Sequence, residues 1–146
     1  MKILSRNETE TWCRTHDIAL DNRLRPLRPL NAERFPIPVD TGQRIATVRA
    51  NLASFENETE TLVWFTEWGA WPSSERMHIF ERFRLSYGEK RLLIDAPGHL
   101  YEHSEFEDLL SYVTLGVLFL WDVFVVTPGL TKIVFYSHDE IGYRTV

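Results

Sequence analysis

The chain has 146 residues, of which 44% are hydrophobic, 13% aromatic and 25% charged, and its formal net charge is −5. This length suits one domain, and the apolar content excludes disorder for most of the chain. The single cysteine, Cys13, excludes an internal disulfide framework and a cysteine-based metal cluster. Because Cys13 follows Trp12 in an amphipathic segment, we expect it to be a small buried hydrophobic residue.

Charge is distributed unevenly along the chain. Residues 1–51 contain nine basic and six acidic side chains, whereas residues 52–146 contain seven basic and fifteen acidic ones. An acidic surface disfavours nucleic acid, because the neutralisation of phosphates supplies most non-specific affinity. Nucleic acid is therefore not an expected partner, and only the N-terminal arginines offer a basic patch: Arg23, Arg25, Arg28 and Arg34.

The sequence also predicts a compartment. The first eight residues lack the apolar core and the cleavage site of a signal peptide. The most apolar stretch, Val113 to Val126, is shorter than the ~20 residues that a membrane span needs, and Asp122 interrupts it. With no disulfide framework either, a bacterial-type cytoplasm without membrane attachment is the expected location.

The N-terminal 40 residues predict a helix followed by an extended segment that covers the core. Ser5 and Glu8 form a capping box, which predicts a helix from Arg6 to about Ala19. Prolines then favour an extended path through residues 22–39. Because leucine and arginine alternate in residues 24–30, we expect the leucines to face the core and the arginines to face solvent.

A second helix is predicted from Thr41 to about Phe55. Asp40 and Gln43 resemble a capping box at its start. Arg44 and Arg49 lie off the apolar face of this helix, so we expect both to be solvated. That face consists of apolar residues at steps of three and four, as a helix with one buried side requires: Ile45, Val48, Leu52 and Phe55.

The rest of the chain predicts strands and two more helices. Strands are expected at 62–68, 91–95, 118–126 and 132–137, with a type II turn at Pro128 and Gly129 before the last one. Helices are expected after Ser73 or Ser74, ending at Gly88, and after a capping box of Ser104 and Glu107. The expected fold is one α+β domain, 1–146, with about four helices packed against a mostly antiparallel sheet of about four strands that ends in a hairpin.

Three segments near strand ends combine polar and aromatic side chains. They are residues 66–75, 96–103 and 136–140, and functional groups tend to collect on such loops. The candidate binding residues within them are Glu67, Trp68, Trp71, Ser73, His99, His103, His138, Asp139 and Glu140.

Four motifs in this part of the chain, W-G-x-W-P-S-S-E, A-P-G-H, W-D and S-H-D-E, resemble a group of small uncharacterised bacterial proteins with no assigned activity. The resemblance covers roughly residues 62–140. It implies a shared fold and assigns no role to any residue.

Metal binding and acid–base chemistry both stay open at these segments. His99 and His103 are four residues apart, and residues 138–140 supply further nitrogen and oxygen donors of the kind that zinc takes. The histidine spacing needs a helix, which the Pro97-Gly98 pair disfavours, so solvated side chains and no metal or cofactor are expected. Glu67 is either a buried general acid or a partnered structural carboxylate. Asp122 allows the same pair of interpretations, and strand alternation adds plain exposure as a third.

Two functions are compatible with this pattern. The first is a non-catalytic protein-binding domain that attracts a basic partner through its acidic surface, as an immunity protein neutralising a toxin would. The second is a small metal- or carboxylate-dependent hydrolase that uses Glu67, His99, His138 and Asp139. Because the chain contains no short catalytic signature, the first is favoured. The second requires Glu67, His99 and His138 to meet at one rim of the sheet.

Overall fold

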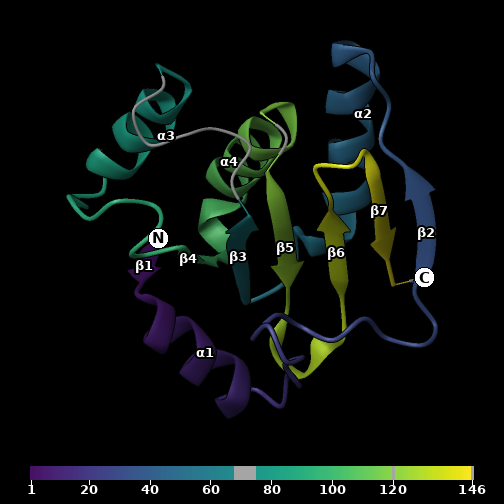
Figure 1. Ribbon diagram of the computed structural model, residues 1–146, viewed down its shortest axis with the longest axis horizontal. Coiled ribbons are helices and arrows are strands. Elements are labelled where there is room, and N and C mark those ends of the chain that lie inside the picture. Colours follow the sequence, from purple (N-terminus) through teal and green to yellow (C-terminus); the bar gives the residue numbers. More distant parts are fainter. Residues whose placement is uncertain (68–74, 120, 146) are drawn as a thin grey trace.

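The computed structural model describes residues 1–67, 75–119 and 121–145 (Figure 1), in which all seven strands form one antiparallel sheet in the order β1-β4-β3-β5-β6-β7-β2. The strands are β1 (Lys2–Leu4), β2 (Glu33–Pro36), β3 (Glu60–Glu67), β4 (Gly98–Glu102), β5 (Asp122–Val126), β6 (Ile133–Tyr136) and β7 (Ile141–Arg144). The helices are α1 (Arg6–Thr15), α2 (Thr41–Leu52), α3 (Glu75–Leu85) and α4 (Phe106–Leu118). An α+β fold is therefore confirmed.

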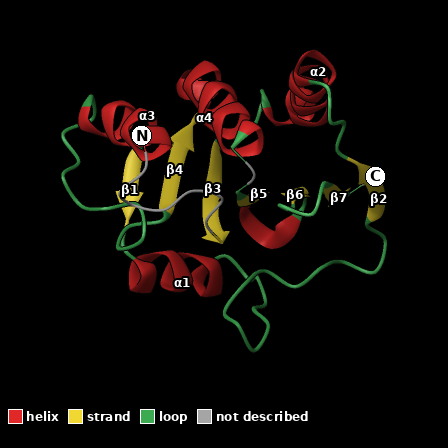
Figure 2. Ribbon diagram, turned by 45° about the horizontal axis from the view of Figure 1, so that its top comes forward, coloured by secondary structure: helices red, strands yellow, loops and turns green. Residues whose placement is uncertain are grey.

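Helices cover both faces of the sheet. Figure 2 shows α1 on one face and α2, α3 and α4 on the other. Because side chains alternate along a strand, β3 and β5 contribute to both sides. Trp64 and Phe124 pack on the α1 side with Cys13 and Ile18, whereas Phe65 packs on the opposite side. The two hydrophobic cores are separated by the central strands.

The predicted starts of the first two helices are confirmed. The side chain of Ser5 accepts a hydrogen bond from the amide of Glu8, whose own side chain returns the contact, and α1 ends earlier than expected, at Thr15. Asp40 accepts a hydrogen bond from the amide of Gln43, and α2 continues through a 3-10 turn at Ala53–Phe55. Each cap satisfies a backbone N–H that has no partner within the helix.

The expected sheet of about four strands is wrong, because the sheet has seven. Strands β1, β2 and β7 are only three or four residues long, and β2 contains Pro36 while β7 contains Gly142. Such short segments carry little alternating pattern. The strand expected at 91–95 is also misplaced: these residues form a turn, and the strand is β4.

The start of α4 differs from the predicted one. Instead of Ser104 with Glu107, the capping box joins Glu102 with Glu105 around a 3-10 turn at His103–Glu105. This turn precedes the first residue of α4, so the hydroxyl of Ser104 is not used as a cap there. By contrast, the turn after β5 is as expected: the amide of Leu130 donates to the carbonyl of Thr127, and Gly129 has a φ of 68°.

Two expectations about solvent exposure are wrong. Arg44 is 6% exposed, and its guanidinium donates to the carbonyl of Pro38 at 2.8 Å and to that of Val117 at 3.1 Å. It thereby donates to a carbonyl in the last turn of α4, where helix carbonyls lack the regular i+4 partner. The extended segment also has its leucines outward, since the exposed fractions are 42% for Leu24, 46% for Leu27 and 108% for Leu30.

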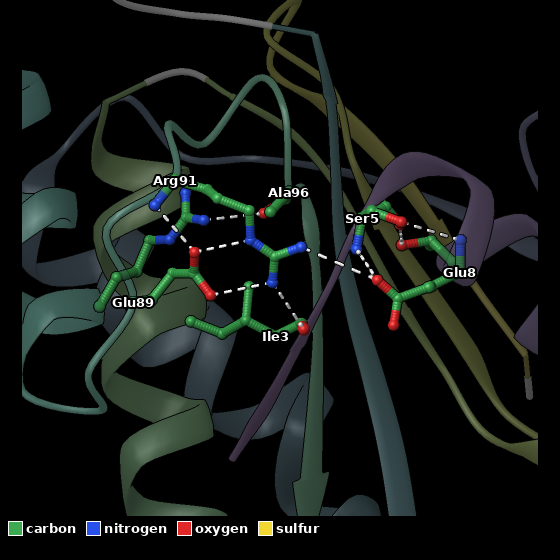
Figure 3. Close-up of polar contacts among 8 residues, drawn as sticks. Ile3, Ser5, Glu8, Glu89, Arg91 and Ala96 are labelled. Carbon is green, nitrogen blue, oxygen red and sulfur yellow. Dashed lines mark hydrogen bonds and ion pairs between the residues drawn. The ribbon is translucent and has the colours of Figure 1, made fainter.

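An arginine ties the chain after α3 to the first strand and helix (Figure 3). Arg91 contacts the carboxylate of Glu89 with Nε at 2.7 Å and Nη2 at 2.9 Å. The same guanidinium lies 3.8 Å from the carboxylate of Glu8 and donates to the carbonyl of Ile3 at 3.3 Å. Because one side chain bridges three segments, it fixes the edge of the sheet at β1.

Two further sequence expectations concern burial and membranes. Cys13 is fully buried, as expected, and desolvation raises the pKa of its thiol to about 12, so the thiol stays protonated and unreactive at neutral pH. Among the described residues, no helix has both the length and the apolar character that a bilayer crossing requires.

Candidate functional site

Polar side chains gather at one end of the central strands. Strand β3 ends there with Glu67, β5 begins there with Asp122, and the turn between β6 and β7 carries His138. Antiparallel order places these three points side by side, because β3, β5 and β6 are consecutive neighbours in the sheet.

A β-bulge brings the two carboxylates together. Trp64 pairs with Phe124 and Phe65 pairs with Val123, but the register then shifts so that Glu67 lies opposite Asp122. Without the extra residue, regular pairing would place Thr66 at that position. Directly opposite residues have Cβ atoms about 4.5–5.5 Å apart, so the bulge makes a close carboxylate pair out of residues that strict alternation would separate.

The buried carboxylate orients the histidine. The side chain of Asp122 is 4% exposed, and its Oδ1 accepts hydrogen bonds from both the backbone amide and Nδ1 of His138, each at 2.7 Å. The imidazole is 46% exposed, and its Nδ1 also lies 3.4 Å from Oε2 of Glu67. Its Nε2 lies 3.3 Å from the exposed carboxylate of Asp139.

The turn that carries His138 has a defined local structure. The amide of Ser137 donates to the carbonyl of Ile141, and Glu140 adopts a positive φ of 63° to close the hairpin. The carboxylate of Glu140 lies 3.3 Å from the buried guanidinium of Arg44. The backbone carbonyl of Glu140 accepts a hydrogen bond from the amide of Ile37. The hairpin is thus held by its neighbours, which fixes the position of the imidazole.

The surrounding carboxylates favour the charged form of the histidine. The pKa of His138 is raised, first by the hydrogen bond to Asp122, and further by the charges of Asp122, Asp139 and Glu67, against a smaller effect of desolvation. A site that stabilises a cation on the imidazole also attracts other cations to the same oxygen atoms.

The ligand atoms of Glu67, Asp122 and His138 all lie within 4.8 Å of one another. Around a tetrahedral ion with bonds of about 2.0–2.1 Å, neighbouring ligand atoms stand roughly 3.3 Å apart. The 3.4 Å between Glu67 and His138 is close to this spacing, whereas the 2.7 Å between Asp122 and His138 is shorter, so these two side chains would separate when an ion binds. Nδ1 of His138 is occupied by its 2.7 Å hydrogen bond to Asp122, so an ion would take the place of the proton on Nδ1. The arrangement suits three protein ligands of one divalent ion, with a carboxylate behind the histidine.

A pocket of about 200 Å³ opens beside this group on the α1 side of the sheet. Glu67 and Thr66 form part of its wall together with Trp64. Arginines from α1 and from the loop after it complete the lining: Arg6, Arg23 and Arg25. Glu67 is therefore shared between the three-residue group and the pocket.

No protein-family model, curated protein or solved structure matches this chain. The resemblance to small bacterial proteins thus stays a prediction, and function is inferred from the geometry of the described residues.

His99 does not join the site, which corrects the expectation of a common rim. It is fully buried in β4 opposite Val63, and its ring contacts Phe65 and Tyr112 on the side of α4. Asp122 alternates with Phe124, which packs on the α1 side, so the two groups lie on opposite faces of the sheet. Burial lowers the pKa of His99 well below its ordinary value, and the imidazole is neutral.

The other predicted residues fall into three groups. His103 lies beyond the far end of β4, where its Nδ1 is 2.6 Å from the carbonyl of Glu56. Glu67 has a side chain that is 52% exposed, so the buried general acid, one of the two interpretations left open, is wrong. The candidates Trp68, Trp71 and Ser73 lie outside the described residues.

Sequence reasoning singled out Asp122 without placing it in the site. A single carboxylate within the apolar run 117–126 was the available signal, since a buried acid needs a partner. That partner, His138, comes 16 residues later, and only the pairing of β5 with β6 brings the two together.

Proposed function

We propose that this protein binds a divalent transition-metal ion through Glu67, Asp122 and His138, and that it acts as a small hydrolase that depends on this ion. The convergence of these three ligand atoms within 4.8 Å carries the proposal. It retains Glu67, His138 and Asp139 from the hydrolase predicted from the sequence, adds Asp122 and leaves out His99.

The donor set decides the class of ion. One imidazole nitrogen and two carboxylate oxygens suit zinc and its neighbours better than magnesium or calcium, which prefer oxygen ligands alone. Glu67 and His138 are both about half exposed, so the outer side of the group is open to solvent. A hydrolytic zinc site needs three protein ligands with one position left for water.

The chemistry would be hydrolysis by a metal-bound water. The ion would lower the pKa of that water, and the water oxygen would form a bond to the electrophilic atom of the substrate as the ester bond breaks. The proton released from the water ends on the leaving group. Glu67, Asp122 and His138 would hold the ion, and the carboxylate of Asp139, 3.3 Å from Nε2, would favour the imidazole electrostatically.

Zinc titration of tag-free, metal-stripped protein tests the proposal. Isothermal titration calorimetry is expected to show one site per chain, and Glu67→Gln and His138→Gln should each weaken zinc binding at least about tenfold. Asp139→Asn should weaken it less, because Asp139 contacts the ligand and not the ion. Glu107→Gln, an exposed change on α4, is the matched control and should bind like the wild type.

Two results would end this proposal. One is a wild-type chain that binds zinc no better than the Glu67→Gln and His138→Gln variants. The other is equal loss of affinity in the Glu107→Gln control, which would indicate binding by scattered surface carboxylates.

A second candidate function is the protein-binding role favoured by the sequence. The observation that supports it is the outward position of Leu24, Leu27 and Leu30, three apolar side chains within one loop. Contiguous exposed apolar side chains mark interaction sites more often than isolated ones do. An immunity-like role remains part of this candidate, with the acidic surface of residues 52–146 serving to attract a basic partner.

Exposed substitutions separate this candidate from the first. In pull-downs from the native host, a stoichiometric partner of the wild type should be lost with Leu30→Asp and kept with Val39→Asp, since Val39 is 80% exposed elsewhere on the molecule. Retention of that partner by Leu30→Asp would exclude this loop as the contact surface.

A further inference from the structure

The pocket beside Glu67 is lined by more positive than negative side chains. Three arginines, Arg6, Arg23 and Arg25, share it with two carboxylates, Glu10 and Glu67. This contrasts with the excess of acidic residues in the chain as a whole. A metal ion on Glu67 would offset one of the two negative charges, which would make the pocket more attractive to an anion.

The arginines are only partly engaged by the rest of the protein. Arg6 donates from Nε to the carbonyl of Ile94 at 3.0 Å, which orients its guanidinium. Arg25 has one ion pair, at 3.6 Å from Asp21. Within the described ranges, the side chain of Arg23 has no hydrogen bond or ion pair. Donors that the fold does not use are available to a ligand.

The loop holds Arg23 and Arg25 toward the same place. The carboxylate of Asp21 accepts from the backbone amides of both residues, at 2.8 and 3.0 Å. Leu24, between them, has a positive φ of 59°. This local turn presents two guanidinium groups from one short segment.

The bulged strand places a threonine in the wall of the pocket. Thr66 lines the pocket, and its hydroxyl oxygen is buried with no hydrogen-bond partner among the residues that the structure describes. A buried hydroxyl without a partner costs free energy, and a rotation of the Thr66 side chain would turn it toward a ligand oxygen in the pocket. The bulge that places Glu67 opposite Asp122 therefore also places Thr66 at the pocket.

We propose that this pocket binds the phosphate group of a small phosphate monoester, so that the ester bond lies beside the metal ligands Glu67, Asp122 and His138. Guanidinium groups match phosphate oxygens with paired hydrogen bonds, and three of them suit a dianion. The volume of about 200 Å³ fits a compact group and excludes a folded polymer from its interior. This inference rests on the proposed hydrolase function, for which it names the substrate class.

Water is the only co-reactant that this reaction needs. The oxygen of a metal-activated water forms the new bond to phosphorus, and the bond from phosphorus to the ester oxygen breaks. The leaving alcohol takes up the proton that the water loses. The products are one alcohol and one inorganic phosphate, with no oxidant or reductant involved.

Binding of inorganic phosphate to the metal-free protein tests the pocket apart from the metal site. Calorimetry should detect saturable binding that Arg23→Ala weakens at least about tenfold, the loss expected for one charge-assisted contact. Arg23→Lys should recover only part of the loss, because lysine keeps the charge without the planar fork. Arg49→Ala, an exposed change on α2 across the sheet, is the control and should bind phosphate like the wild type.

Failure of the two proposals can be told apart. Zinc binding without phosphate binding, or phosphate binding that Arg49→Ala reduces as much as Arg23→Ala does, would overturn the phosphate pocket and leave the metal site standing. Phosphate binding without zinc binding would overturn the hydrolase and leave an anion pocket. If single-stranded nucleic acid bound more tightly than inorganic phosphate and lost that affinity in Arg23→Ala, the monoester assignment would be wrong.

The last test measures hydrolysis when the metal site holds zinc and the pocket holds a phosphate ester. Zinc-loaded wild type should release phosphate from p-nitrophenyl phosphate, Arg23→Ala should raise KM, and His138→Gln should lower kcat. A change of kcat alone in Arg23→Ala would contradict its assignment to substrate binding.

Discussion

Single ion pairs decide how this fold responds to acid. The hydrogen bond from Arg91 holds the pKa of Glu89 at about 2, below its ordinary value of 4.5, and the side chain of Glu89 is 13% exposed. Because the folded-state pKa is the lower one, the stabilisation is complete above about pH 4.5 and is lost as the pH falls toward 2. Glu89 thus contributes to stability at neutral pH and not in strong acid.

Replacing this carboxylate should remove its pH-dependent contribution. We expect Glu89→Gln to lower the free energy of unfolding at neutral pH by about 1–2 kcal/mol, allowing for the partial exposure of Arg91. The difference from wild type should shrink as the pH approaches 2. Urea denaturation at a series of pH values measures it, with Glu107→Gln as the exposed control. A difference that stays constant with pH would show that packing, and not the charge, is responsible.

At the scale of elements, the close approach of β2 and β7 depends on one glycine. A Cβ atom on Gly142 would lie 2.5 Å from the carbonyl oxygen of Phe135 and 2.5 Å from the ring of Phe35. Both neighbours are fixed, the first as sheet backbone and the second as a buried ring. Strand β2 can therefore pack at this edge only if β7 has no side chain here.

The substitution Gly142→Ala tests this contact. It should destabilise the fold by about 1–3 kcal/mol, because the ring or the strand must move to make room. Gly42→Ala in α2 is the matched control: its Cβ would meet only the carboxylate of Asp40, at 3.4 Å, and alanine favours a helix. Thermal unfolding of both variants measures the difference. Equal stability of Gly142→Ala and wild type would mean that β2 shifts at little cost.

The sequence predicted elements with strong local signals and missed those defined by tertiary pairing. The caps at Ser5 and Asp40 and the apolar run of β5 depend on neighbouring residues and were found. A strand such as β1 forms because β4 pairs with it, and its three residues are too few to show the alternation of apolar and polar side chains that predicts a strand. For the same reason the approach of Glu67 to Asp122 could not be predicted, since it depends on a bulge.

At the scale of the whole molecule, the residues of the two proposed sites come from two layers, the sheet and the α1 layer, which we expect to differ in stability. The metal ligands come from β3, β5 and the adjoining hairpin, where β5 is buried at every position. The pocket arginines come from α1 and the loop after it, and α1 buries only Thr9 and Cys13. Layers with few buried residues open at lower free energy than a central sheet does.

Native-state hydrogen exchange should reveal this difference. We expect amides of α1 to exchange through openings of lower free energy than amides of β3 and β5, which should exchange only on global unfolding. Phosphate should slow exchange in α1 by tying Arg6 to Arg23 and Arg25 across the pocket, whereas zinc should act mainly on the hairpin that carries His138. Equal protection of α1 and β5 in the free protein would show that the α1 layer unfolds only with the sheet.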